Sequence, residues 1–93
     1  MGKAQDLANL LSVGASIVMD TEPKTLYWFA LQIDDAHFGI IDFFADQSGI
    51  DAHFAGGAAA ALKENAADLI EGGWEQGVVA GIQSYNVLTF LVR

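Results

Sequence analysis

The sequence predicts an α+β protein in which helices cover one face of an antiparallel sheet. Residues 4–19 place apolar side chains at three- and four-residue spacing, as an amphipathic helix does. Residues 25–33 and 37–45 are rich in aromatic and β-branched side chains, as strands are. The predicted order is helix, strand, strand, helix, helix, strand, with no internal repeat or linker. We therefore expect one domain over residues 1–93.

The first predicted helix has one buried face and a defined end. Polar residues separate its apolar ones, so a single stripe faces the core. Pro23 disfavours helical geometry at Glu22 and thereby ends the helix. The expected buried positions are Leu7, Leu10, Leu11, Gly14, Ile17 and Val18.

The two predicted strands form a hairpin that is apolar on both faces. Residues 34–36, Asp-Asp-Ala, supply the turn between them. In the second strand Phe38 and Phe44 share one face with Asp42, and Phe43 lies on the other. An antiparallel hairpin usually has one solvated face. We therefore expect something other than the chain's own helices to cover the second face.

Two helices are predicted after the hairpin. Ser48, followed three residues later by Asp51, resembles a capping box and begins a short helix over residues 48–55. A double glycine separates it from a longer helix over residues 58–71, and a second double glycine ends that helix.

The tail of the chain is predicted to return to the sheet. Its β-branched and aromatic residues place a final strand at about residues 85–92. The same residue types allow an additional, shorter strand around residues 77–82. Such a strand would extend the antiparallel sheet beneath the helices.

The apolar content predicts a partner. Residues of the apolar class make up 53% of the chain, above the usual 45 to 50% or so of globular domains. A chain of 93 residues has too small a core to hide that surface. The simplest solution is a homodimer about a two-fold axis.

The charges exclude several partners and compartments. Four basic and twelve acidic residues give a net charge of −8, which opposes binding to nucleic acid and to anionic membrane surfaces. The mixed N-terminal residues resemble neither a signal peptide nor a membrane span. Because cysteine is absent, there is no thiolate nucleophile and no disulfide framework. We expect a cytoplasmic protein.

Common catalytic motifs are missing from the sequence. It has no glycine-rich nucleotide loop, no GxSxG and no HExxH. His37 and His53 lack carboxylates at ligand spacing, so we expect no metal site.

Four segments carry a resemblance to a known family. They are GKAQDLANLL, EPKTLYWFALQ, FGIIDFFADQSGIDAHFAG and NVLTF. In this order and spacing the chain resembles the antibiotic biosynthesis monooxygenase family of dimeric α+β barrel proteins, over roughly residues 2–92. The resemblance implies a ferredoxin-like antiparallel sheet with helices on one face, two copies that pack their sheets together, and a pocket between sheet and helices.

The chain departs from that family at defined positions. The family begins with a strand ahead of Gly2, and here only Met1 precedes it. We therefore expect this first strand to be missing, either because the chain is truncated or because the tail or a partner takes its place. Members that oxidise aromatic polyketides or quinols have a tryptophan where this chain has Phe44, and an asparagine where it has Ile40. The resemblance therefore implies the fold more strongly than the reaction.

His53 and Asp42 are the candidate catalytic residues. An imidazole exchanges protons near neutral pH, so His53 fits a general base, but it also fits a structural hydrogen-bond donor. Asp42 lies among aromatic neighbours, where a carboxylate must be paired or protonated. It fits either a pocket base, whose pKa an apolar setting raises, or a hydrogen bond to the neighbouring strand.

Four aromatic residues are candidates for binding a substrate. Trp28, Phe38 and Phe44 would form the walls of the pocket, and Trp74 would cap the pocket or the dimer seam. Aromatic residues in strands also commonly serve only as core.

Two functions remain open at this point. One is a cofactor-independent monooxygenase that binds a planar phenol or quinol and removes a proton, so that the substrate carbanion reduces dioxygen. The other is a non-catalytic homodimer of the same fold that binds a small apolar ligand or an interaction partner.

Overall fold

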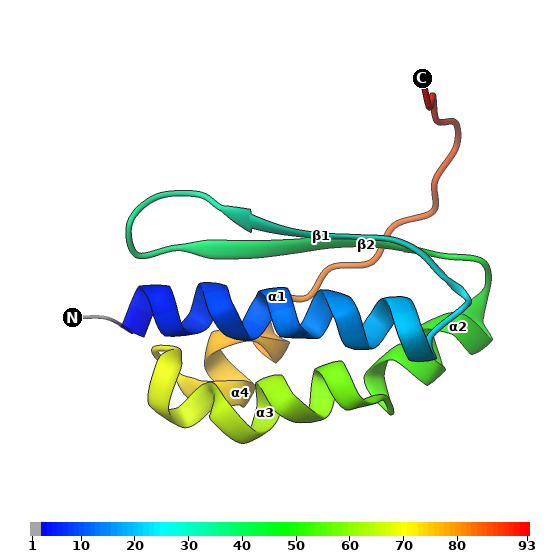
Figure 1. Ribbon diagram of the computed structural model, residues 1–93. Helices are drawn as coiled ribbons and strands as arrows, with labels where there is room; N and C mark the ends of the chain where they lie inside the picture. Colours follow the sequence, from blue (N-terminus) through cyan, green and yellow to red (C-terminus); the bar gives the residue numbers. More distant parts are fainter. Residues whose placement is uncertain (1–2) are drawn as a thin grey trace.

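Four α-helices lie on one side of a β-hairpin in the computed structural model, which describes residues 3–93 (Figure 1). The α+β class is confirmed. The family's first strand concerns positions at and before Gly2, which lie outside the described residues. The elements are α1 (Lys3–Thr21), β1 (Thr25–Gln32), β2 (Phe38–Phe44), α2 (Gln47–Phe54), α3 (Gly57–Leu69), α4 (Gly73–Gly77) and a 3₁₀ turn (Val79–Gly81).

The end of α1 is set by the turn that contains Pro23. The Glu22 N–H still donates to the Val18 carbonyl at 3.0 Å, and the Thr25 N–H then donates to the Glu22 carbonyl at 3.1 Å. Pro23 has the fixed φ that suits the second position of such a turn. Leu11, Gly14 and Val18 are buried, as their spacing predicted, and lie toward the other elements.

The structure fixes the register of the hairpin, which the sequence left open. Trp28 pairs with Asp42, and Gln32 pairs with Phe38 at the turn end. The chain reverses at residues 33–37, where the Ile33 N–H donates to the His37 carbonyl at 2.9 Å. The pairing places Asp42 on the face toward the helices, next to the strand that carries Trp28.

The cap of α2 differs from the predicted capping box. Asp46 is the N-cap, and its Oδ1 accepts from the Gly49 N–H at 3.1 Å and from the Ser48 hydroxyl at 2.6 Å. Asp51 instead accepts from the Gln47 amide at 3.0 Å. The helix consequently begins one residue earlier than predicted.

The first double glycine separates α2 from α3, as predicted. Gly56 is the N-cap of α3, and α3 ends at Leu69, two residues before the predicted end. Small residues allow α3 to pack closely on α1: a Cβ placed on Gly14 would lie 4.0 Å from the Ala58 Cβ. The buried apolar residues are correspondingly few and small, namely Leu11, Val18, Ala58, Ala59 and Ala66.

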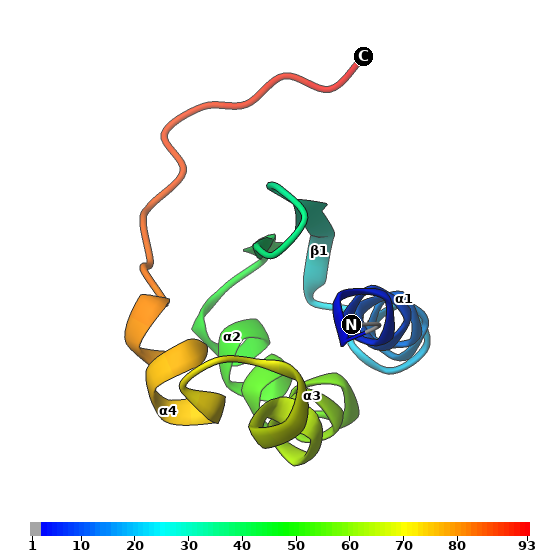
Figure 2. The same cartoon turned by 90° about the vertical axis from the view of Figure 1, so that its left-hand side faces the viewer.

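The predicted strands at residues 85–92 and 77–82 are both wrong for the single chain. Residues 73–81 form α4 and the 3₁₀ turn, and residues 83–93 run away from the rest of the molecule without regular structure (Figure 2). A strand requires a neighbouring strand to satisfy its backbone groups, and the tail has none among residues 3–93. The described sheet therefore has two strands.

The outer face of the hairpin, which points away from the helices, is apolar and exposed. We define this outer face by the exposed residues Tyr27, Phe29, Leu31, Ile33, Ile41 and Phe43. The rings of Tyr27 and Phe29 stack with centroids 6.2 Å apart, and Phe43 meets Tyr27 edge-on. The structure thus places a continuous aromatic and aliphatic patch where the sequence predicted an unsolvated second face.

No helix in residues 3–93 combines the length and the apolar character that a membrane crossing requires.

The packing around Gly14 predicts that alanine stabilises the protein at this position. A Cβ there would lie 3.7 Å from the Trp28 ring, an ordinary contact, and alanine avoids the entropic cost of glycine within a helix. We expect Gly14→Ala to raise the free energy of unfolding by about 0.5–1 kcal/mol, measured by urea denaturation. Gly14→Leu should lower it by about 1–3 kcal/mol, because its side chain overfills the contact between α1 and α3. Equal effects of the two substitutions would contradict this packing.

Candidate functional site

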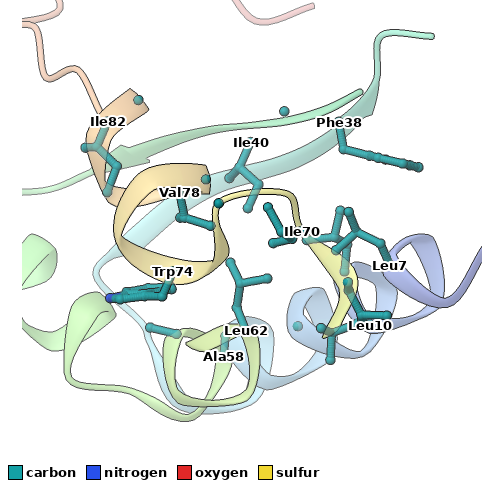
Figure 3. Close-up of a pocket in the computed structure, with 18 of the residues that line it drawn as sticks. Leu7, Leu10, Phe38, Ile40, Ala58, Leu62, Ile70, Trp74, Val78 and Ile82 are labelled. Atoms are coloured by element: carbon teal, nitrogen blue, oxygen red, sulfur yellow. The ribbon is translucent and has the colours of Figure 1, made fainter. Parts of the chain in front are cut away.

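A cleft of about 940 Å³ lies between the hairpin and the helices. Apolar side chains from several elements point into it, as Figure 3 shows for Leu10 of α1, Leu62 of α3, Ile40 of β2 and Trp74 of α4. Its volume is at the upper end of the range of about 300–1,000 Å³ that is usual for ligand pockets. The described polar groups in the lining include Asp42 and His53. The cleft therefore suits a largely apolar molecule with a small number of polar atoms.

His53 lies between two carboxylates. Its Nδ1 is 2.6 Å from Glu22 Oε1, and its Nε2 is 3.3 Å from Asp42 Oδ2. The side chains of Glu22 and His53 are only 4% and 10% exposed, whereas that of Asp42 is 24% exposed. Asp42 is thus the most accessible of the three residues, and Glu22 lies behind the imidazole.

Three different elements bring these side chains together. The turn after α1 directs Glu22 beneath the hairpin, the register of β2 places Asp42 on its inner face, and α2 carries His53. The start of α2 is held against the same turn, because Lys24 Nζ donates to the Ser48 hydroxyl at 2.6 Å. The position of His53 is therefore fixed relative to both carboxylates.

His53 Nε2 and Asp42 Oδ2 are close enough to share a proton. A neutral imidazole that donates from Nδ1 to Glu22 has a lone pair at Nε2, so Asp42 would then have to be the acid that donates to it. If Glu22 is the acid that donates to Nδ1, the neutral imidazole donates from Nε2 to Asp42. An imidazolium would donate to both carboxylates.

The environment of Asp42 raises its pKa. Burial is the main cause, because it disfavours the charged carboxylate, and the negative charge of Glu22 acts in the same direction. The opposite charge of His53 and a backbone hydrogen bond lower the pKa in part. The net rise favours a carboxyl group that binds a proton at higher pH than an exposed aspartate does.

The predicted aromatic residues are placed in two ways. Trp28, Phe38 and Trp74 line the cleft. The indole N–H of Trp28 is buried without a hydrogen-bond partner among residues 3–93, so it is an unsatisfied donor on a residue of the cleft lining. Phe44 lies instead against the ring of His53, with centroids 5.3 Å apart, and does not line the cleft. Its contact with the imidazole restricts the orientation of that ring.

Glu22 belongs to the site although its place in the sequence predicted no such role. Its position before Pro23 indicated only the end of a helix, yet a helix end that turns back under a sheet can bury the side chain at that point. Glu22 is 5% exposed, and its Oε2 has no hydrogen-bond partner among residues 3–93. The signal in the sequence that could have identified Glu22 is its position as an acidic residue immediately before the only proline.

Gly56 makes room for the Glu22 carboxylate. A Cβ at Gly56 would lie 2.8 Å from Glu22 Oε2 and 3.1 Å from the Ala52 carbonyl oxygen. The close approach of the backbone at this glycine therefore involves a carboxylate of the protein itself.

His37 also lines the cleft, but from the hairpin turn. Its Nδ1 is 2.8 Å from Asp34 Oδ1, and its side chain is 71% exposed. Within residues 3–93 no group of three histidine or acidic side chains is arranged to hold a metal ion.

Comparison with known proteins identifies the fold but no function. No family model matches the chain, and no protein of curated function matches it. A crystal structure of a protein of unknown function from Nitrosomonas europaea matches 73% of this chain with 41% identity and a TM-score of 0.68. The match covers 65% of that protein, which is less than two thirds of its length. The two chains share a fold over the matched part.

The contact at Gly56 gives a prediction for stability. Gly56→Ala should lower the free energy of unfolding by about 1–3 kcal/mol, because the new methyl group would collide with the Glu22 carboxylate. Gly81→Ala is the matched control, since no atom of residues 3–93 lies within 4 Å of the added Cβ. Its effect should stay within about 0.5 kcal/mol. Urea denaturation of both variants tests the difference, and similar values would contradict the close approach.

The raised pKa of Asp42 gives a prediction for pH dependence. Because the folded state holds this proton more tightly than the unfolded state, Asp42 favours folding below its ordinary pKa of 3.8, and this contribution is lost as the pH rises through the folded-state pKa. The amide introduced by Asp42→Asn does not titrate. We expect the thermal midpoint of this variant to exceed that of the wild type at pH 8, and the difference to shrink toward pH 4. A difference that grows on acidification would refute the assignment.

Proposed function

We propose that the chain is a cofactor-independent monooxygenase that oxidises a planar hydroxylated aromatic compound in the cleft. The observation that carries the proposal is the pair of His53 and Asp42, which holds a proton at the edge of an apolar cleft. The resemblance of the segments around these residues to the antibiotic biosynthesis monooxygenase family supports the same reaction.

The cleft favours a flat apolar substrate. Trp28, Phe38 and Trp74 offer aromatic surfaces for stacking, and the lining includes aliphatic side chains from α1 and α3. A substrate hydroxyl or carbonyl group would lie toward Asp42, the more exposed member of the pair. Anthrones and hydroquinones combine these properties.

In the proposed reaction the His53–Asp42 pair first releases its shared proton to solvent, and the free base then removes a C–H proton from the substrate. For an anthrone-type CH₂ group, the carbanion then gives electrons to dioxygen and forms a C–O bond, which yields a hydroperoxide after protonation. Loss of water from the hydroperoxide leaves a carbonyl group. One oxygen atom ends in the product and one in water, and the four-electron oxidation of CH₂ to C=O matches the reduction of dioxygen.

Glu22 acts in this proposal as a positioning residue. Its Oε1 lies 2.6 Å from His53 Nδ1, so an imidazole that donates to Glu22 presents its other nitrogen, Nε2, toward Asp42 and the cleft. This is the logic by which a buried carboxylate orients a catalytic histidine in other enzymes.

We further propose that two copies pair through the outer face, as in a ferredoxin-like, dimeric α+β barrel. An exposed patch with Tyr27, Phe29 and Ile41 at its centre is unusual for a monomer. A second copy would remove this patch from water on both molecules at once, because a two-fold axis brings the same surface together.

Oxygen uptake tests the reaction. The wild type should consume oxygen with a panel of anthrones and hydroquinones, and His53→Ala should reduce kcat by about 10²–10⁴-fold, the usual contribution of a general base. Asp51→Ala is the matched control, because this exposed residue of the same helix does not line the cleft, and should leave the rate unchanged.

Two results would contradict the proposal. One is an equal loss of rate in the His53→Ala and Asp51→Ala variants. The other is a rise in thermal midpoint with these compounds but no oxygen uptake, which indicates a binding protein, since a ligand that binds only the folded state stabilises it without turnover.

A further inference from the structure

The C-terminal arm, residues 83–93, makes no use of its apolar side chains within its own molecule. Leu88 is 95% exposed and Tyr85 is 80% exposed, although the arm is rich in residues that proteins normally bury. The backbone–backbone hydrogen bonds of residues 3–93 outside the helices and strands end at Ile82, before the arm begins. The Tyr85 hydroxyl donates to Gln83 within the arm. The arm is otherwise extended chain whose apolar side chains and backbone groups have no partner among residues 3–93.

The sequence of the arm is that of a strand buried on both sides. In an extended chain Val87 and Leu91 point to one side, and Leu88, Phe90 and Val92 point to the other. A strand with two apolar sides belongs between two layers, as strands of buried sheets do. Contact with a single surface would leave one of its sides in water.

The hairpin provides what the arm lacks. Its outer face is an exposed apolar layer, and within residues 3–93 each strand pairs only with the other, so each has an open edge with free backbone groups. The arm has 11 residues, which span about 35 Å when extended at about 3.3 Å per residue. This length exceeds that of β1, which has 8 residues.

We propose that the C-terminal arm crosses to a second copy of the chain and lies against the hairpin of that copy, in a reciprocal exchange. Figure 2 shows that the arm leaves the helices beside α4 and extends away from the body, so arm and outer face do not meet within one molecule. The arm and the outer face belong to the same chain. In a two-fold dimer each arm can therefore be buried against the hairpin of the other copy.

The charges favour this partner for the arm. The chain has a net charge of −8, so two copies repel each other over most of their surfaces. The arm has no acidic side chain and carries Arg93, which makes it the segment that a second acidic copy repels least. The inference rests on the pairing of copies proposed above and does not depend on the reaction.

Cysteine cross-linking tests the exchange directly, because the chain has no native cysteine. Single cysteines are introduced in the arm (Val87→Cys, Thr89→Cys or Leu91→Cys) and on the outer face (Leu31→Cys or Ile33→Cys). An arm variant is mixed with a face variant and treated with a short bis-maleimide. We expect a product that joins one arm chain to one face chain, identified by mass spectrometry. A variant that carries both an arm cysteine and a face cysteine shows whether the arm reaches the face of its own chain. Cross-links formed only within one such chain, or no cross-link at any position, would overturn the exchange.

Sedimentation velocity separates arm exchange from pairing through the outer face alone. The wild type should sediment as a dimer at micromolar concentration, and the double variant Leu88→Asp with Phe90→Asp should shift to monomer. The control Val13→Asp with Met19→Asp adds the same charge at exposed apolar positions of α1, and should remain a dimer. If Phe29→Asp dissociates the dimer but the arm variant does not, copies pair without exchange, and the inference fails.

The outcome is independent of the enzymatic assay. Arm cross-links without oxygen uptake overturn the proposed reaction and leave the exchange intact. A monomer that consumes oxygen overturns the exchange and leaves the proposed reaction intact.

Discussion

The contact between Glu22 and His53 determines how the rest of the molecule is arranged. It joins the turn after α1 to α2 beneath the hairpin, at a distance of 2.6 Å and with almost no solvent access. A buried carboxylate is unfavourable unless it is paired, so α1 and α2 cannot separate from the hairpin without exposing or orphaning this charge. Asp42 then meets the other ring nitrogen, and the same contact that ties the elements together also builds the candidate site.

This arrangement places a costly polar group where the apolar core is small. Among residues 3–93 the buried apolar side chains include only two larger than alanine, Leu11 and Val18, while Glu22 Oε2 is buried without a partner. An unsatisfied buried acceptor costs about 1–3 kcal/mol, a large fraction of the stability of a small domain. Because the apolar core is small and contains this cost, burial of further apolar surface would add a large share of the total stability. The exposed outer face and the C-terminal arm would provide that surface on association.

Local patterns in the sequence predicted most of the helices and both strands of the hairpin, because each of these elements satisfies its backbone within itself or with its nearest neighbour. The strand expected at residues 85–92 fails for the opposite reason: its partner edge is not adjacent in the chain. Asp42 was recognisable because a carboxylate is unexpected in an apolar strand, and His53 because an imidazole exchanges protons near neutral pH. Glu22 was not, since only the turn at Pro23 shows that its side chain points inward.

The two sides of β2 link assembly to the site. Because side chains alternate, the register that points Asp42 toward His53 also points Ile41 and Phe43 outward, and a shift of one residue would exchange them. In an isolated molecule the outward residues gain little from this register, since they are exposed in either case. A partner that covers the outer face would favour the correct register, and so hold Asp42 in place. Association would then contribute to the geometry of the site although the partner need not touch the substrate.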